Sequence, residues 1–481
     1  MYFHSISFAL FLPTAVAGFW FLPQALRKWW LLGVSYLFYM GTFPRYAALL
    51  LLVTLVAYFS GLALARWPGH RRLLLWVSIS LDLGILAAFK YAELFRSTLA
   101  SLLGEVGVQI RLEPLAILAP VGLSFYVFIA MSYTIECYRK TTAPVKDFSL
   151  FACYLSFFPQ LLAGPIVRPG QLLPQLRQAS PLRMSLFEQG LRLFILGLFK
   201  KVLLADRLAP VVDHGFSAAH TLTALDAWVS VLAFTFQIYF DFSGYTDCAR
   251  GCAKLFGYEL PENFYLPYLS ANPREFWRRW HVTLSTWLRD YLYIPLGGNR
   301  CSKKRMYGNL MATMALGGLW HGAAWTFLFW GIYHGLLLVL HRRIMELKEA
   351  VAWARALLES RAGAVLGRLV TFVLVALGWV VFRARSLEEA GAMYTALTRL
   401  GEGGSSLTLL VGSAVPIFAG CLLLYHAGRV ALARVSGLYP SLQRAWTWAA
   451  LAALLVIVAY RAYFCLESGY GAPKPFIYFQ F

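Results

Sequence analysis

The chain has 481 residues, of which 59% are hydrophobic and only 14% charged, and its formal net charge is +20. Soluble domains carry about 25% charged residues, so this composition excludes an ordinary soluble enzyme and indicates a chain solvated by membrane lipid. The 43 basic residues against 23 acidic ones suit the cytoplasmic loops of a membrane protein. They form no soluble binding module with the aromatic residues, so we expect no nucleic acid partner.

Long, nearly uncharged apolar runs follow one another along the chain. A spanning helix needs roughly 20 predominantly apolar residues, and shorter runs at 29–43 and 150–163 fit tilted spans or re-entrant segments. The sequence therefore predicts an all-α polytopic membrane protein with about eleven transmembrane helices plus re-entrant or interfacial helices. The long runs lie at 5–23, 46–65, 73–91, 115–135, 228–240, 324–340, 366–382, 408–425 and 447–463.

Basic residues beside the first spans give the orientation. No basic residues precede the first run, so it is predicted as a retained helix rather than a cleaved signal peptide. Arg27 and Lys28 follow it, which places the N-terminus outside and these two residues inside. Lys90 and Glu93, three residues apart, are predicted to pair on one helix at a membrane face.

No soluble domain interrupts the chain, so we expect one membrane-embedded domain over 1–481. Residues 1–150 are predicted as N-terminal helices and residues 366–481 as C-terminal helices. Residues 235–341 differ from both, because they combine aromatic, charged and histidine residues with an embedded character. Ionisable groups in lipid are costly and tend to mark function, so this segment is the predicted catalytic core.

The core begins with an apolar run that ends in two carboxylates, Asp241 and Asp247. Carboxylates six residues apart point to different faces of a helix, so they do not form an acid/base pair. A structural polar network is the favoured interpretation. Asp241 is kept as a candidate substrate-binding residue.

The stretch 275–291 mixes aromatic and basic residues. It is predicted as one amphipathic helix that lies at the membrane interface or dips into the membrane. Arg278 and Arg279 lie off its apolar stripe, where guanidinium groups suit either phosphates or lipid headgroups. Both interpretations stay open from the residues alone. The stripe consists of Trp277, Trp280, Leu284, Trp287 and Leu288.

His321 lies inside the stretch 306–341, which is too long for one untilted span. Glycines 317, 318 and 322 predict a break there. A histidine so far from the flanking basic residues must face the protein interior or a wet cavity. Burial favours the uncharged imidazole, which is the form that a general base needs. Without further information, a core histidine that only satisfies hydrogen bonds is the simpler interpretation.

Several well-known motifs are absent from the sequence. It contains no GxSxG, P-loop or HExxH pattern, which disfavours a serine hydrolase, an ATPase and a zinc protease. The seven cysteines include no CxxC pair, and Cys248 and Cys252 alone make a poor metal site. We therefore expect neither a bound metal nor a bound cofactor.

Taken together, the core motifs resemble the membrane-bound O-acyltransferase family, in particular the bacterial branch that contains the alginate O-acetylation membrane protein. The resemblance covers essentially the whole chain, although Arg250 is a charge that this branch usually lacks. It is carried by Tyr239–Tyr245 (YFDFSGY), Pro261–Phe264 (PENF), Phe276–His281 (FWRRWH), Trp287–Gly298 (WLRDYLYIPLGG) and Gly318–Trp325 (GLWHGAAW), with Phe11–Pro13 and Pro475–Phe481 near the two ends.

The resemblance implies that His321 is the catalytic histidine and His281 a second catalytic residue, within a ring of tilted helices around a central pore. It also implies a cytoplasmic acyl thioester donor, with acetyl-CoA as the expected one. Arg278 and Arg279 then suit the donor phosphates, whereas Trp320 and Tyr291 are candidates to stabilise the oxyanion. Together with Asp241 these are the predicted substrate-binding residues.

We therefore expect an O-acetyltransferase of the bacterial inner membrane, embedded in membrane lipid. It would move acetyl groups across the membrane for O-acetylation of an exported polysaccharide, alginate-like or another cell-envelope glycan, through a periplasmic acyltransferase partner. One alternative is a transporter or flippase for a polysaccharide or lipid-linked sugar. Another is the same enzyme class with a different acyl group. Transfer of labelled acetyl would distinguish the enzyme from the flippase.

Overall fold

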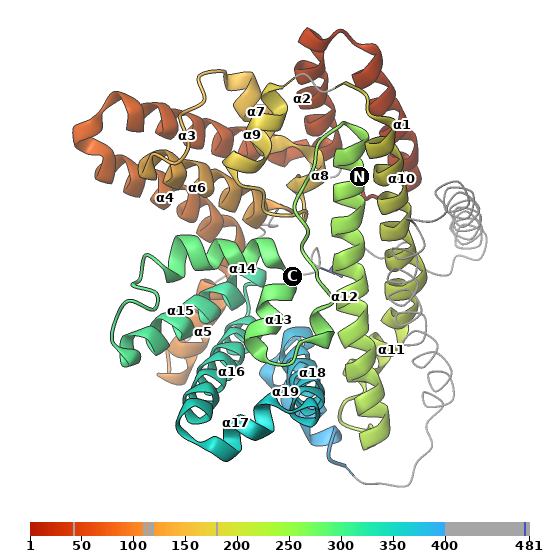
Figure 1. Ribbon diagram of the computed structural model, residues 1–481, viewed down its shortest axis with the longest axis vertical. Helices are drawn as coiled ribbons and strands as arrows, with labels where there is room; N and C mark the ends of the chain where they lie inside the picture. The colour runs from red at the N-terminus through yellow and green to blue at the C-terminus, as the bar shows by residue number, and fades with distance from the viewer. Residues whose placement is uncertain (42–43, 109–112, 114–119, 179–180, 400–475, 478–481) are drawn as a thin grey trace. The chain divides into compact units, whose positions relative to one another are not determined.

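A computed structural model of the chain describes residues 1–41, 44–108, 113, 120–178, 181–399 and 476–477, and every regular element in these residues is a helix (Figure 1). The chain divides into two compact units. Of the described residues, those within Met1–Leu191 and Ala249–Thr371 form the first unit, and those within Arg192–Cys248 and from Phe372 onward form the second. The predicted spans at 408–425 and 447–463 lie outside the described residues.

The N-terminal helices of the first unit follow the predicted apolar runs. α4 and α5 are joined without a break by a π-helical turn, Ala87–Tyr91, so that Pro68–Glu105 forms one helix of 38 residues. A π-helical turn inside a helix often marks a functional site. The helices are α1 (Ile6–Phe21), α2 (Gln24–Met40), α3 (Ala47–Arg66), α4 (Arg71–Leu86), α5 (Ala92–Glu105) and α6 (Leu123–Arg139).

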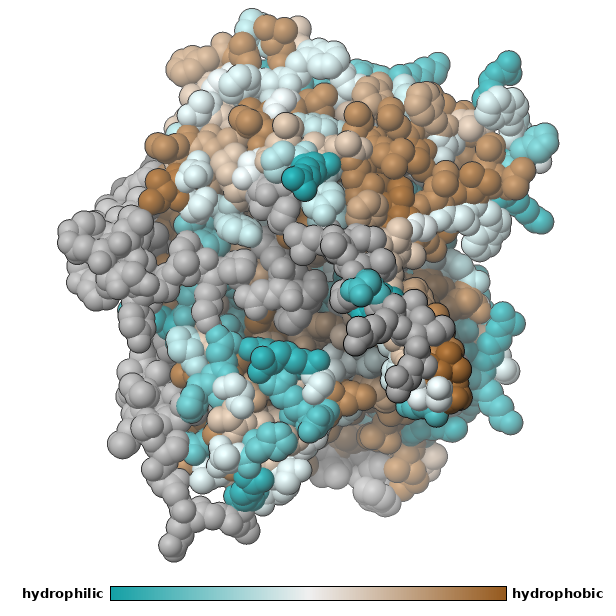
Figure 2. Space-filling model, turned by 180° about the vertical axis from the view of Figure 1, so that it is seen from behind, coloured by the Kyte–Doolittle hydropathy of each residue, from teal (hydrophilic) through white to brown (hydrophobic). Residues whose placement is uncertain are grey.

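Among the described helices, Pro44–Arg66, Pro68–Glu105 and Arg361–Arg383 are long and apolar enough to cross a membrane. Large apolar side chains such as Leu73 and Trp76 on α4 stand 61% and 65% exposed, and hydrophobic residues gather on the surface in Figure 2. Side chains of this kind favour a lipid environment over water. The apolar run at 150–163 instead forms two short buried helices, α7 (Phe148–Ser156) and α8 (Phe158–Leu161).

The predicted single helix over 275–291 is wrong. The chain forms α13 (Pro273–Arg279) and α14 (Val282–Leu288), separated by Trp280 and His281. His281 has φ 41° and ψ 54°, a left-handed conformation that cannot continue a right-handed helix. The apolar periodicity over the two segments was real, but it did not reveal this reversal of the backbone.

The break predicted near the glycines of 306–341 is confirmed. α15 (Lys303–His321) ends at His321 and α16 (Trp325–Ala350) starts four residues later. The two helices lie side by side (Figure 1). An added Cβ on Gly318 would collide with the Phe327 carbonyl oxygen, and one on Gly331 with the Met314 carbonyl oxygen. Small residues thus let the two backbones approach closely, which makes a helical hairpin with His321 at its turn.

The second unit contains most of a long helix, α12, and shorter helical segments that come before and after it along the chain. α10 and α12 approach closely there, because an added Cβ on Gly197 would meet the Gly244 carbonyl oxygen. Its elements are parts of α10 (Met184–Leu198), α12 (Ala224–Leu255) and α18 (Arg361–Arg383), together with the π-helical turn Phe199–Ala205, α11 (Asp206–Ser217) and α19 (Leu387–Ala396).

Candidate functional site

The structure brings His321 and His281 together in the first unit. Their ring centroids lie 6.4 Å apart, and the two residues are 5% and 0% exposed. Trp320 lies against both, at centroid distances of 5.0 Å from His321 and 5.9 Å from His281. The two predicted catalytic histidines and one predicted substrate-binding residue therefore form one buried cluster.

Aromatic rings surround this histidine pair. Trp330 meets His321 edge-on at 5.1 Å and also contacts His334 at 4.8 Å. Phe125 packs against Trp320 at 5.0 Å. The Trp320 indole N–H points to the Ser124 carbonyl oxygen at 3.4 Å. This shell of rings leaves the imidazoles in largely apolar surroundings, in which electrostatic interactions are stronger than in water.

Asn263 holds the left-handed turn at His281. Its backbone carbonyl accepts the Val282 N–H at 3.0 Å, and its side-chain oxygen accepts the Thr283 N–H at 3.1 Å and the Thr283 hydroxyl at 2.7 Å. The first N–H groups of a helix have no partner within the helix, so Asn263 supplies acceptors for the start of α14. We did not single out this residue from the sequence, although it lies in the PENF motif.

Lys90 has different partners from the one that the sequence predicted. The predicted Lys90–Glu93 pair is wrong, because Glu93 pairs with Arg96 at 2.5 Å. Lys90 instead donates to the carbonyl oxygens of Trp320 at 2.6 Å and His321 at 3.1 Å. A lone lysine inside the apolar run 73–91 was the available signal, but helical spacing points only to local partners and cannot reveal a contact 230 residues away.

The two arginines proposed for phosphate binding differ in their surroundings. Arg279 donates to Glu275 at 2.6 Å and to the Tyr265 carbonyl oxygen at 3.2 Å. Arg278 is exposed, and no described residue pairs with it. Of the two, Arg278 is therefore the side chain that is available to an anionic ligand.

Tyr291 takes part in a separate polar cluster. Its hydroxyl donates to Glu136 at 2.7 Å, and the guanidinium groups of Arg139 and Arg168 lie over its ring at 5.3 Å and 5.2 Å. Arg168 also pairs with Asp290 at 2.6 Å. The hydroxyl that was considered for oxyanion stabilisation is thus occupied by a carboxylate.

Asp241 lies in the second unit, inside a buried ionic network. One carboxylate oxygen accepts the Lys201 ammonium at 2.5 Å, and the other accepts the Ile477 backbone N–H at 2.6 Å. Lys201 also contacts Asp206 at 3.0 Å, whereas Asp247 pairs with Lys200. The geometry corresponds to the structural network favoured from the sequence. The two carboxylates, Asp241 and Asp247, pair with different lysines.

Comparison with known sequences identifies the family. The sequence model of the membrane-bound O-acyltransferase family matches residues 64–373, which is more than half of the chain. The chain belongs to this family. It is therefore a membrane-bound O-acyltransferase, and of the two classes that the sequence left open, the enzyme is favoured over the transporter.

Relatives that match this O-acyltransferase over most of its length include proteins with two different names. The protein named "Probable alginate O-acetylase AlgI" of Pseudomonas putida is 37% identical over 98% of this chain and 98% of its own length. The protein of the same name from Azotobacter vinelandii is 40% identical over 82% of this chain and 77% of its own length. A Helicobacter pylori protein named peptidoglycan O-acetyltransferase is 33% identical over 98% and 95%. Membership of the family thus leaves the acceptor open.

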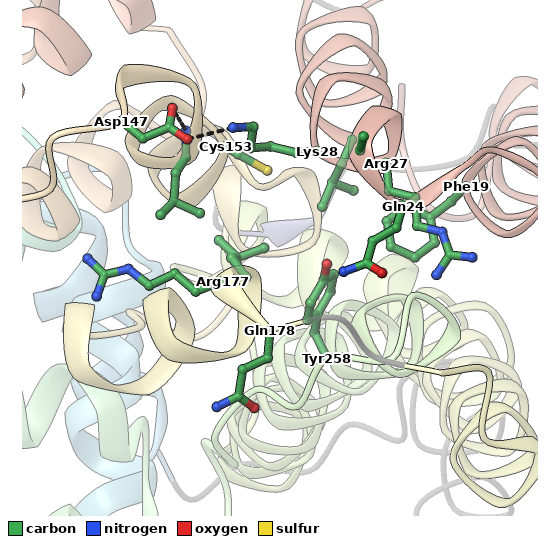
Figure 3. A pocket seen from close by; sticks show the side chains of 13 residues that line it. Phe19, Gln24, Arg27, Lys28, Asp147, Cys153, Arg177, Gln178 and Tyr258 are labelled. Carbon is green, nitrogen blue, oxygen red and sulfur yellow. Dashed lines mark hydrogen bonds and ion pairs between the residues drawn. The ribbon is translucent and has the colours of Figure 1, made fainter.

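A cavity of about 580 Å³ lies elsewhere in the first unit of this O-acyltransferase. Arg27, Lys28 and Arg177 are among the residues that line it, and Lys28 pairs there with Asp147 at 2.6 Å (Figure 3). None of the predicted site residues lines it. Among the described residues, no group of three or more histidine, cysteine or acidic side chains is arranged to hold a metal ion.

Proposed function

We propose that this enzyme moves acetyl groups from cytoplasmic acetyl-CoA across the membrane for O-acetylation of an exported, alginate-like polysaccharide, with His321 as the general base. The observation that carries the proposal is the buried pair of His281 and His321 at the turn of the α15–α16 hairpin. It is supported by relatives that are named for O-acetylation of alginate and of peptidoglycan.

The chemistry needs one proton acceptor and no bound cofactor. An acceptor hydroxyl oxygen attacks the thioester carbonyl carbon while its proton passes to a ring nitrogen of His321. The carbon–sulfur bond then breaks, and the proton leaves with the thiolate as free thiol, so that one ester and one thiol are formed. Proton transfer by a positioned side chain contributes roughly 10²–10⁴-fold to the rate. His281 and Trp320 orient the imidazole and the reacting groups.

The position of the two substrates explains why the reaction needs a pore enclosed by protein. Donor and acceptor are on opposite sides of the bilayer, so a pore within a ring of about eleven spanning helices brings them together. Arg278 binds the donor phosphates on the cytoplasmic side, whereas Arg279 is held by Glu275 beside it. The chain acts in the bacterial inner membrane and passes acetyl to a periplasmic acyltransferase partner, which completes the modification of the polysaccharide.

The test is His321→Gln, which keeps a hydrogen-bonding side chain of similar size but cannot accept a proton at neutral pH. Purified protein in proteoliposomes, supplied with its periplasmic partner, receives labelled acetyl-CoA, and label is counted in mannuronate oligosaccharides and in muropeptides in parallel. We expect an unchanged melting temperature, donor binding within a few-fold, and transfer reduced by at least ~100-fold.

His334→Gln is the matched control, because it removes another buried imidazole from the same aromatic shell. We expect it to keep transfer within a few-fold of the unmodified protein. Near-normal transfer by a well-folded His321→Gln protein would remove His321 from the mechanism. Label that enters muropeptides but not mannuronate would overturn the alginate-like acceptor and leave the base assignment intact.

A further inference from the structure

Three successive carbonyl groups at the end of α15 accept hydrogen bonds from one π-helical turn. The Tyr91 hydroxyl donates to the Leu319 carbonyl at 2.7 Å. The Lys90 ammonium donates to the Trp320 carbonyl at 2.6 Å and the His321 carbonyl at 3.1 Å. The last four carbonyls of a helix have no partner within the helix. Two neighbouring residues of a distant helix therefore satisfy the final turn, which carries His321.

The π-helical conformation explains how adjacent residues reach one target. In an α-helix with 3.6 residues per turn, side chains of consecutive residues diverge by about 100°. The wider turn at Ala87–Tyr91 changes that angle, and Lys90 and Tyr91 both point to the end of α15. Such turns are uncommon and are frequent at functional sites.

The end of α15 favours a hydrogen-bond donor beside its last carbonyl groups. The C-terminal end of a helix carries a partial negative charge, and a nearby cation stabilises it. No described carboxylate pairs with Lys90, whose third contact is the Ser124 hydroxyl at 3.2 Å. An ammonium group has three donors, and here all three are used on α15 and α6. Lys90 therefore has no free donor for a substrate.

We propose that Lys90 is a positioning residue, whose ammonium clamps the end of α15 to α6 and so fixes the direction in which the His321 imidazole points. This inference rests on the proposed function of His321 as base. Because His321 is the last residue of its helix, fraying of that turn would move its Cα. A misplacement of 1 Å in a reacting group can reduce a rate about 10²-fold.

The test compares Lys90→Met, Lys90→Arg and Tyr91→Phe with His321→Gln in the proteoliposome assay with labelled acetyl-CoA. Lys90→Met removes the clamp and keeps the volume of the side chain. We expect kcat to fall about 10–100-fold, with KM for acetyl-CoA within about threefold and the melting temperature close to that of the unmodified protein. Lys90→Arg restores a cation with several donors and should recover at least part of kcat.

Tyr91→Phe is the matched control on the same turn, because it frees only the Leu319 carbonyl and leaves those of Trp320 and His321 bonded. We expect its kcat to stay within about threefold of the unmodified protein. If Lys90→Met keeps full kcat while His321→Gln is inactive, the positioning role is wrong and the proposed function stands. If Lys90→Met loses melting temperature and activity in proportion, Lys90 is only structural. If His321→Gln is active, the proposed function fails first.

Discussion

Two lysines, Lys90 in the first unit and Lys201 in the second, each lie on a π-helical turn between two α-helical segments. Lys201 is 1% exposed and contacts two carboxylates, those of Asp241 and Asp206. Lys90 is partly buried and contacts two backbone carbonyls and one hydroxyl, with no carboxylate partner among the described residues. A π-helical turn therefore presents a lysine to carboxylates in one case and to backbone carbonyls in the other.

Under the proposed function, this difference separates a structural lysine, Lys201, from a lysine that positions a reacting group, Lys90. A buried ion pair balances its own charges, and loss of one partner mainly costs folding energy. Lys90 instead donates its hydrogen bonds to the helix end that carries His321, and no described carboxylate pairs with it. We therefore expect changes around Lys201 to reduce the amount of folded protein, and changes around Lys90 to reduce turnover.

The largest expected effect is on folding in the second unit. Asp241→Leu leaves Lys201 buried with only Asp206 and removes the acceptor of the Ile477 N–H. Breaking a buried pair by removing one partner costs about 3–5 kcal/mol. We expect a low yield in the membrane and a melting temperature reduced by many degrees in detergent.

The double variant Lys201→Met/Asp241→Leu separates charge imbalance from lost packing. Apolar residues of similar volume often replace a buried ion pair without loss of stability, so the double variant should melt well above Asp241→Leu alone. Transfer that falls much further than the amount of folded protein would contradict the structural assignment and return Asp241 to the substrate-binding residues.

A smaller effect on stability is expected where α15 packs against α16. The contact of Lys90 with the end of α15 can position His321 only if this hairpin is rigid. Gly318→Ala would place a Cβ against the Phe327 carbonyl oxygen, and overpacking of this kind costs about 1–3 kcal/mol. Gly308→Ala on the same helix is the control, because nothing lies within 4 Å of its Cβ position. It should stabilise the helix by about 0.5–1 kcal/mol. Equal melting temperatures for the two variants would show that the helices are not in close contact at Gly318.

The sequence predicted the elements of this structure better than their connections. Apolar runs located the N-terminal helices because spanning segments are long and nearly uncharged. The glycines of 306–341 located the hairpin turn, since close backbone contact and a break both require small residues. The proximity of His281 to His321 came from a resemblance to a family, because residues 40 positions apart carry no local signal of contact.

What the sequence could not reveal depends on long-range partners. Lys90 was assigned to its helical neighbour Glu93, because spacing on one helix is visible and a contact with His321 is not. The reversal at His281 was missed, since its stabilisation comes from Asn263, which lies in a different segment. Both cases involve functional geometry in which a tertiary contact outweighs a local preference.

The reversal at His281 allows the backbone and the imidazole to be tested separately. A left-handed conformation costs a residue with a side chain roughly 1–2 kcal/mol, whereas glycine adopts it freely. We therefore expect His281→Gly to be more stable than His281→Ala by about 1–2 kcal/mol, measured by thermal unfolding in detergent. Both variants lack the imidazole, so both should lose transfer to a similar extent. Higher transfer by the glycine variant would mean that the turn matters more than the ring.

The smallest effect is expected at an exposed pair, Lys28 and Asp147, which serves as a reference for the two buried lysines. Burial alone would raise the pKa of Asp147, but hydrogen bonds from Lys28, Ser149 and the Leu150 N–H lower it to about 2. The stabilisation is therefore complete above the ordinary value of 3.8 and is lost as the pH falls through about 2. At neutral pH the carboxylate is fully charged.

Asp147 also caps α7 by accepting the Leu150 N–H at 3.2 Å, so two substitutions divide its contributions. Asp147→Asn keeps the cap and removes the charge, which should cost less than about 1 kcal/mol because exposed pairs contribute little. Asp147→Ala removes both, and loss of a cap adds about 1 kcal/mol. The difference between the unmodified protein and Asp147→Asn should shrink in 1 M salt, where the Debye length is only about 3 Å. The difference between Asn and Ala should persist there, because a hydrogen bond to a backbone N–H is not screened. A salt-independent effect of Asp147→Asn would mean that this pair is shielded from solvent and resembles Lys201 more than its exposure suggests.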